Sequence, residues 1–255
     1  MNPSFRRSAV AVAACGALIL VGCSQQGSSP APDAAQQQAQ TQAAEASKQL
    51  DTYRELLRIK NDQMASSLGQ DIVDHYPNTA EAKEVQQTLP EVRQRWKDNS
   101  EQARLKALWL YQVGPMEGGT QSTATIYSSK PTGDHMVRLI LRRHTSWGQS
   151  VFLFGSGHGF VCKGNCTIPA TFDGKPHGLR AFLPTTGEPA IFIRDDKDFI
   201  TAMRKAKKIT MDVTLQDGEE KETLVYEVAG FDPDKWVGVG KGVNAKAESA
   251  KSDKK

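Results

Sequence analysis

The chain has 255 residues and a formal net charge of +3, with 32 lysines and arginines against 29 acidic residues. This length suits one medium-sized domain with extensions. The near balance of charge lacks the clustered basic footprint of a nucleic-acid-binding protein, and no metal-ligand spacing is evident. We therefore expect no nucleic-acid partner, no metal and no cofactor.

The first 22 residues have the order of an export signal. Arg6 and Arg7 precede an apolar stretch, residues 8–22, that is too short to span a bilayer. The stretch leads into Leu20-Val21-Gly22-Cys23, which resembles the lipobox of bacterial lipoproteins. That resemblance implies cleavage before Cys23 and a membrane anchor of acyl chains such as palmitate on Cys23. An ordinary export signal with an incidental cysteine is the alternative.

The residue after the cysteine bears on the location of the anchor. Ser24 stands where retention in the inner membrane typically requires aspartate. The resemblance therefore implies an outer-membrane lipoprotein that faces the periplasm.

Both ends of the mature chain are poor in apolar residues. Residues 23–47 consist mainly of Ser, Gln, Ala, Pro and Gly, and residues 237–255 are rich in Lys, Ala and Ser. Such segments bury too little surface to offset the entropy of ordering them. We expect a flexible tether at residues 23–47 and a disordered tail at residues 237–255.

Residues 48–107 have the periodicity of helices. One apolar stripe is formed by Leu50, Tyr53, Leu57, Met64, Leu68 and Ile72. It predicts one helix that ends before Pro77. Asn78 is the expected N-cap of a second helix over residues 79–89, with Glu81 completing a capping box. Pro90 is expected to begin a third helix.

The segment Tyr76-Pro77-Asn78-Thr79-Ala80-Glu81-Ala82 resembles the turn between helices in tetratricopeptide-like repeats. The resemblance covers about one repeat, and one repeat cannot bury both its faces. It implies a local helical hairpin that packs on the domain behind it.

From residue 108 the period of the apolar residues falls to two. The predicted strands are residues 108–111, 122–128, 136–142, 150–154, 159–162, 166–172, 179–183, 190–193, 208–215 and 223–228. A short helix is predicted over residues 198–205, and residues 216–218 are a hairpin signal. This pattern over residues 108–236 predicts an α+β protein. Its helical hairpin precedes an antiparallel β-sandwich or partly open barrel with one short helix.

Several features of this region occur in a characteristic order. They are Trp109 and Tyr111, the arginine-bearing segment 137–143, the cysteine pair, the Phe172-Asp173-Gly174 turn, the Ile193-Arg194-Asp195 strand end and the segments 199–208 and 226–231. In this order the region resembles an uncharacterised β-rich domain of bacterial envelope proteins, and more loosely the accessory proteins of type VI secretion systems. The resemblance implies a fold and carries no established reaction.

Cys162 and Cys166 are the cysteines that remain after the signal Cys15 is removed and Cys23 is lipidated. Gly164 and Asn165 between them favour a turn, and the periplasm permits disulfides. We expect a disulfide that clips one hairpin. A redox pair is the alternative, although redox motifs have two intervening residues and precede a helix.

No catalytic constellation is recognisable. The five histidines, His75, His135, His144, His158 and His177, are scattered, and no Gly-x-Ser-x-Gly turn occurs. Asp195, Asp196 and Asp198 precede the short helix, where capping explains them.

One basic cluster follows the short helix. Its members are Arg204, Lys205, Lys207 and Lys208, and Arg138, Arg142 and Arg143 on a predicted strand would enlarge it. The first interpretation of the cluster is a solvated face, and the alternative is a contact surface for an anionic polymer, a membrane headgroup or an acidic partner. The whole pattern predicts a non-catalytic, lipid-anchored protein with a periplasmic protein partner. The alternatives are an immunity or inhibitor lipoprotein that neutralises a periplasmic toxin or hydrolase, and a cell-wall enzyme.

Overall fold

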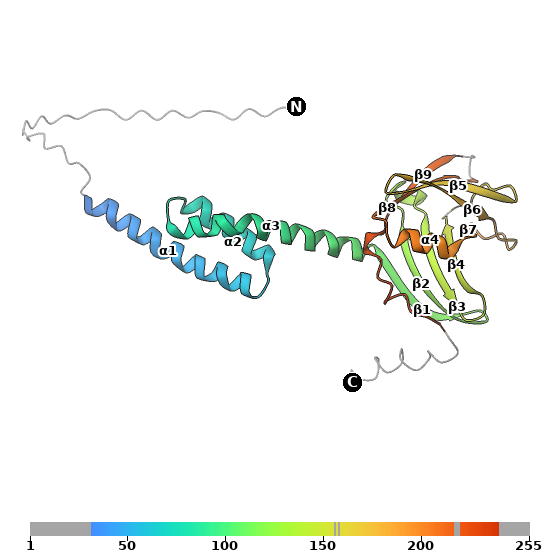
Figure 1. Cartoon of the computed structure of the whole chain (residues 1–255), viewed down its shortest axis with the longest axis horizontal. Helices are drawn as coiled ribbons and strands as arrows, with labels where there is room; N and C mark the ends of the chain where they lie inside the picture. Colours follow the sequence, from blue (N-terminus) through green and yellow to red (C-terminus); the bar gives the residue numbers. More distant parts are fainter. Residues whose placement is uncertain (1–31, 156, 158, 217–219, 240–255) are drawn as a thin grey trace, which may run out of the picture.

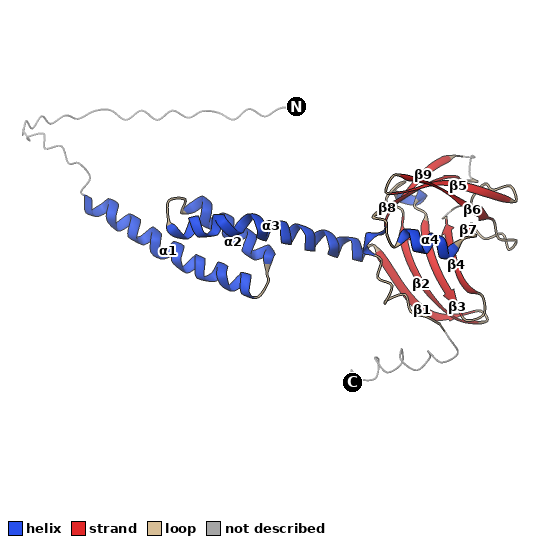
Figure 2. Cartoon of the chain, viewed as in Figure 1, coloured by secondary structure: helices blue, strands red, loops and turns tan. Residues whose placement is uncertain are grey.

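The computed structural model describes residues 32–155, 157, 159–216 and 220–239. These residues form four α-helices and nine β-strands, which confirms the predicted α+β class. Three helices extend from one end of a strand-rich body (Figure 2). The expected signal peptide, Cys23 and most of the expected tail lie outside the described residues.

The three N-terminal helices form a unit that we call the helical arm. They are α1 (Pro32–Arg58), α2 (Asp62–His75) and α3 (Ala80–Ala107). Buried apolar residues recur at helical spacing in α1 and in α3, where they are Ala46, Leu50, Tyr53, Leu56, Ala82, Val85, Leu89 and Val92. Gly69 of α2 lets the three helices approach closely, because a Cβ there would lie 2.9 Å from both Leu89 and Tyr53.

The start of α1 corrects the expected tether. Residues 32–47, predicted to be flexible, belong to this helix. The composition explains the difference, because alanine and glutamine are good helix formers and proline is favoured at the first helical position. Ala46 is fully buried against the rest of the arm, so packing also holds this segment.

The single helix predicted over residues 50–72 is two helices. α1 ends in a Schellman motif: Asn61 N–H donates to the Leu56 carbonyl and Lys60 N–H to the Leu57 carbonyl, with Lys60 at φ 57°. The Asn61 side chain then caps α2 by accepting a hydrogen bond from Met64 N–H at 3.2 Å. The chain reverses here, so Met64, predicted to be in the apolar stripe, is 57 % exposed.

The two helices predicted on either side of Pro90 are one. α3 continues through this proline, which lies on the exposed side of the helix between buried Leu89 and Val92. Packing of those two residues outweighs the single backbone hydrogen bond that a proline removes. The cap was also displaced by one residue: Thr79, and not Asn78, accepts the hydrogen bond from Ala82 N–H.

The nine strands form one antiparallel sheet in the order β1-β2-β3-β4-β7-β6-β5-β8-β9. The strands are β1 (Trp109–Met116), β2 (Gly119–Tyr127), β3 (Arg138–His144), β4 (Gly148–Phe154), β5 (Asn165–Phe172), β6 (Lys175–Phe182), β7 (Ala190–Ile193), β8 (Lys208–Thr214) and β9 (Lys221–Glu227). Nine of the ten predicted strands overlap these elements. Residues 159–162 are the exception, since only a bridge from Phe160 to Leu215 forms there.

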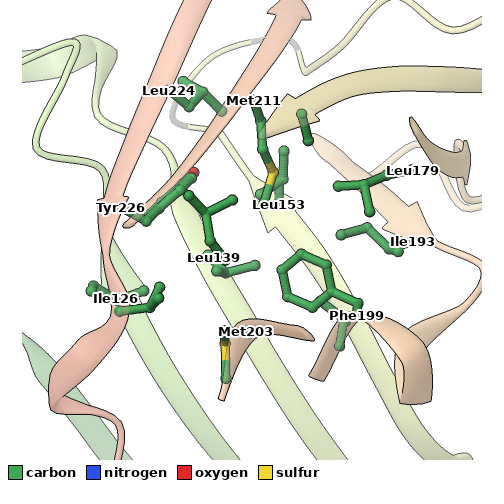
Figure 3. Packing of buried hydrophobic residues seen from close by; sticks show 14 of the residues in the cluster. Ile126, Leu139, Leu153, Leu179, Ile193, Phe199, Met203, Met211, Leu224 and Tyr226 are labelled. Atoms are coloured by element: carbon green, nitrogen blue, oxygen red, sulfur yellow. The ribbon is translucent and has the colours of Figure 1, made fainter. Parts of the chain in front are cut away.

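The sheet bends so that its last strand returns to the loop after β2. Ser129 N–H donates to the Val225 carbonyl at 2.7 Å, and Val225 N–H donates to the Lys130 carbonyl at 3.0 Å. The inner side of this bend holds the main core. α4 (Asp196–Met203) contributes Phe199 and Met203, which lie near Leu139 and Ile193 (Figure 3). The predicted short helix is therefore an inner element of the sheet domain, by which we mean residues 108–239.

The arm meets the sheet domain at one joint, where α3 ends against the 3-10 helix η2 (Val228–Gly230) (Figure 1). A Cβ on Gly230 would lie 2.1 Å from the Leu105 carbonyl oxygen, so this joint requires glycine. Arg104 pairs with Glu227 across it at 2.7 Å. The arm was predicted to pack on the domain, but its core is a separate cluster.

Candidate binding surface

Strands β4 and β7 are apolar on both of their faces. Val151 and Leu153 of β4, with Ile191 and Ile193 of β7, point into the main core. Phe152 and Phe192 alternate with them and belong to a second, smaller cluster on the opposite side. We call the opposite side of β1, β2, β3, β4, β7 and β6 the outer face.

An apolar row crosses the outer face through neighbouring strands. The register places Ile140 opposite Phe152, Phe152 opposite Phe192, and Phe192 opposite Phe182. The rings of Phe152 and Phe192 stack with centroids 4.8 Å apart, and those of Phe192 and Phe182 with centroids 5.5 Å apart. Each ring therefore turns a face toward its neighbour rather than toward solvent.

Three arginines lie over these rings. The Arg142 guanidinium carbon lies 5.0 Å from the centre of the Phe152 ring, and that of Arg194 lies 4.5 Å from the Phe182 ring. Arg138 lies 4.5 Å from the Phe154 ring. Cation–π attraction at these distances holds the guanidinium groups in place. We name the three arginines with Phe152, Phe154, Phe182 and Phe192 the arginine–aromatic face.

Among the described residues no carboxylate forms an ion pair with Arg138, Arg142 or Arg194, whereas Arg54, Arg58, Arg95, Arg104 and Arg180 all have one. Burial lowers the pKa of Arg142, and the Glu188 carboxylate opposes that effect. An arginine keeps its charge in such surroundings. The three arginines outnumber the Glu188 carboxylate in the groove that Arg138 and Arg142 line, so the face carries net positive charge.

Exposed apolar side chains surround the arginines on the same face. Leu110, Met116, Tyr127 and Trp147 are between 42 % and 49 % exposed. A shallow groove of about 340 Å³ crosses the strands here, with Met116, Arg138, Arg142 and Glu188 in its lining. Protein contact surfaces are enriched in such arginine and aromatic side chains.

The predicted basic patch is divided. Arg204, Lys205, Lys207 and Lys208 are exposed after α4, but the Asp173 carboxylate accepts hydrogen bonds from the backbone N–H groups of Lys207 and Lys208. Arg138 and Arg142 lie on β3, which four other strands separate from β8 in the sheet. The two groups therefore do not form one surface.

Arg143 points the other way from its neighbour Arg142. Its guanidinium lies 3.7 Å from the Trp236 ring and donates to the Trp236 carbonyl oxygen at 2.6 Å. Alternation along β3 causes this separation, since successive side chains of a strand point to opposite faces. Arg143 thus fixes the segment after η2 instead of extending a basic patch.

The disulfide between Cys162 and Cys166 is present, with an S–S distance of 2.13 Å. Its setting differs from the predicted hairpin clip. Cys166 lies in β5, but Cys162 lies in a loop, so the bond ties that loop to the start of a strand. Gly164 provides the left-handed turn between them at φ 66°.

The prediction for the aspartates at the start of α4 is confirmed in part: Asp196 and Asp198 lie in the first turn of the helix, where negative charge complements the helix dipole. Asp195 occupies the N-cap position but makes no capping hydrogen bond with its side chain. Its carboxylate accepts a hydrogen bond from Arg180 at 2.7 Å, and this bond lowers the Asp195 pKa. Asp196 accepts a hydrogen bond from Gln149.

The histidines are dispersed over the fold. His75, His135 and His177 are exposed, and His158 lies outside the described residues. His144 is buried at the β3–β4 turn, where its Nδ1 accepts hydrogen bonds from the backbone N–H groups of Ser146 and Trp147. Its ring stacks on that of Trp147. His144 therefore orders the turn that carries Trp147, an exposed residue at the edge of the outer face.

Sequence reasoning identified Arg138 and Arg142 but missed Arg194 and the phenylalanines. The available signal was the continuous apolar run Val151-Phe152-Leu153-Phe154, repeated in Ala190-Ile191-Phe192-Ile193. Such runs are typical of strands that are covered on both faces. In this fold the second cover consists of arginine side chains.

Comparisons with known proteins add no relative. No family model matches the chain, and no curated protein and no solved structure matches it. Within the described part of the chain, no three His, Cys, Asp or Glu residues gather in a way that could hold a metal ion. The described helices also include none that is long and apolar enough to cross a membrane.

Proposed function

We propose that the protein is a non-catalytic binding protein, anchored in the outer membrane by lipid on Cys23, that binds a periplasmic protein through the arginine–aromatic face. One observation carries the proposal: three arginines that form no ion pair with a described carboxylate share one face of the sheet with exposed apolar side chains. Protein interfaces are enriched in arginine and aromatic residues, and their strongest contacts come from such groups.

The proposal assigns the helical arm to a spacing role. Residues 93–104 of α3 are exposed throughout, between Val92, the last buried core residue that α3 contributes to the arm, and the joint at Leu105. At 1.5 Å per residue this stretch is about 18 Å long. The arm would hold the sheet domain away from the membrane, and we describe the bent sheet as a partly open barrel that serves as the binding platform.

The binding role is tested by photo-crosslinking in living cells. A photoreactive residue at Tyr127, on the rim of the arginine–aromatic face, should yield a discrete crosslinked protein. The same residue at Lys175, exposed on β6 at the turn with β5, is the control and should yield none. No crosslink at Tyr127, or equal crosslinks at both positions, would defeat the proposed surface.

The identity of the crosslinked species decides between roles. An envelope component would favour an assembly role, and an incoming toxin or hydrolase would favour the immunity alternative. Turnover of purified peptidoglycan by the protein, lost on changing one carboxylate or histidine, would instead establish the cell-wall enzyme.

The anchor is tested separately. Cys23→Ala should abolish labelling by fatty acid and release the protein from the membrane fraction, because the acylated thiol is removed. Equal labelling and membrane recovery of the variant and the parent protein would reject the lipoprotein assignment.

A further inference from the structure

We propose that the partner segment bound by the arginine–aromatic face is an extended acidic polypeptide, with two carboxylates about four residues apart and apolar residues beside them. This inference rests on the proposed binding function and adds the chemistry of the partner. It is carried by three guanidinium groups that lie on one face of the sheet and form no ion pair with any described carboxylate.

The guanidinium groups are preorganised donors. Arg142 donates through Nε to Ser150, and Arg194 donates through Nε to Asn165 at 3.1 Å. The phenylalanine rings beneath them restrict their motion further. A guanidinium presents a planar fork that pairs with a carboxylate through two hydrogen bonds. Because little side-chain freedom remains to be lost, these arginines are prepared to bind a carboxylate.

The spacing of the arginines matches an extended chain. Arg138 and Arg142 lie four residues apart on β3 with side chains on the same face, a separation of about 13 Å. Two acidic residues four apart in an extended segment above β3 have the same separation. Tyr127, exposed on β2 opposite Arg138, would contact the apolar residues of that segment.

The ring geometry argues against a sugar ligand. Sugars that bind aromatic residues stack on an open ring face, but the rings of Phe152, Phe192 and Phe182 face one another. Guanidinium groups lie over the same rings, and Phe152 is only 7 % exposed. The groups presented to a ligand are therefore charged donors surrounded by apolar side chains.

A binding measurement with defined peptides tests the inference. The protein, purified in detergent, is titrated with a fluorescent extended peptide that contains two glutamates four residues apart among valines and serines. The matched peptide has glutamine in place of both glutamates. We expect the acidic peptide to bind at least about tenfold more tightly, since its carboxylates alone can pair with the arginines.

Two triple variants with the same change in charge locate the site. Arg138→Gln, Arg142→Gln and Arg194→Gln together should weaken binding of the acidic peptide about tenfold or more. Lys205→Gln, Lys207→Gln and Lys208→Gln together should change it less than about twofold, because these exposed lysines act only as screened, distant charges. Equal losses in both triples would mean that total charge and not this face binds the peptide, and would overturn the inference.

Single variants and further ligands keep the test decisive if the triple arginine variant does not fold. Arg138→Gln alone uncovers only the Phe154 ring and should still weaken binding of the acidic peptide. Arg142→Lys should also weaken it, because lysine keeps the charge but lacks the planar guanidinium that pairs with a carboxylate through two hydrogen bonds. Equal affinity for the two peptides, or binding to phosphatidylglycerol vesicles without binding to the acidic peptide, would overturn the inference. A crosslink at Tyr127 together with no acidic preference would reject the acidic segment while leaving the proposed binding function intact.

Discussion

The helical arm and the sheet domain bury their apolar residues in different ways. The arm assembles its core from three helices adjacent in sequence, with Leu50, Tyr53 and Leu89 among its members. The sheet domain joins strands distant in sequence, since β4 pairs with β7 and β5 pairs with β8. The two cores share no residue and meet only through the joint at Leu105 and Gly230. This difference indicates two separately stabilised units with a fixed connection.

The largest expected effect separates the two units. Phe199→Ala removes a ring that is 1 % exposed in the main core and should lower the free energy of unfolding of the sheet domain by about 3–5 kcal/mol. The arm should keep its stability, because none of its core residues contacts that ring. Hydrogen exchange followed by mass spectrometry resolves the two units in one experiment.

A reciprocal variant is the control. Ile72→Ala opens the core of the arm and should cost about 2–5 kcal/mol there, with the sheet domain unchanged. If either substitution lowers protection of both units equally, the arm and the sheet domain unfold as one unit and the comparison fails.

The next largest expected effect on stability comes from a substitution at the joint between α3 and η2. Gly230→Ala places a methyl group 2.1 Å from the Leu105 carbonyl oxygen, so the backbone of α3 or of η2 must shift. We expect a loss of about 1–3 kcal/mol. Small-angle scattering should detect a changed angle or a broader range of angles between arm and domain. Gly238→Ala is the matched control, because a Cβ there meets nothing within 4 Å. A Gly230→Ala variant with unchanged stability and scattering would show that the joint is not close-packed in solution.

The difference between local contacts in the arm and distant strand pairing in the sheet domain also explains which features the sequence could predict. Helical periodicity located the arm, and alternation located β7 at residues 190–193 with both ends correct. The turn at Lys60 was missed because a lysine occupies a left-handed position that usually signals itself by glycine. Helix propensity at residues 32–47 was underestimated because low hydrophobicity was taken as disorder.

The candidate surface was only partly predictable for a different reason. Arg138 and Arg142 share a face by alternation on one strand, which sequence alone can indicate. Phe152, Phe192 and Phe182 become neighbours because β7 inserts between β4 and β6, and pairing between distant strands leaves no local pattern. The position of Arg194 over the Phe182 ring depends on the pairing of β7 with β6 as well. That the three arginines form no ion pair with a described carboxylate can be seen only in the three-dimensional structure.

The smallest expected effect concerns an exposed ion pair of the sheet domain that has no counterpart on the arginine–aromatic face. The hydrogen bond from Arg180 lowers the pKa of Asp195 below its ordinary value of 3.8. A carboxyl with a lowered pKa in the folded state contributes stability at pH values above its unfolded pKa. That contribution is lost as the pH falls through the folded pKa. Asp195→Asn should therefore reduce the fall in stability below about pH 4, and Arg180→Gln should do the same because it removes the other partner.

The size of that effect is limited by solvent, since both side chains are exposed and such pairs contribute little. Urea unfolding between pH 2 and pH 7 measures it, and 1 M salt should diminish the difference between parent and variant, because the Debye length falls to about 3 Å. An identical pH profile for the parent protein and both variants would show that the pair does not form in solution. Arg180 would then resemble Arg138, Arg142 and Arg194 in having no ion pair with a described carboxylate, and the contrast between Arg180 and those three arginines would be lost.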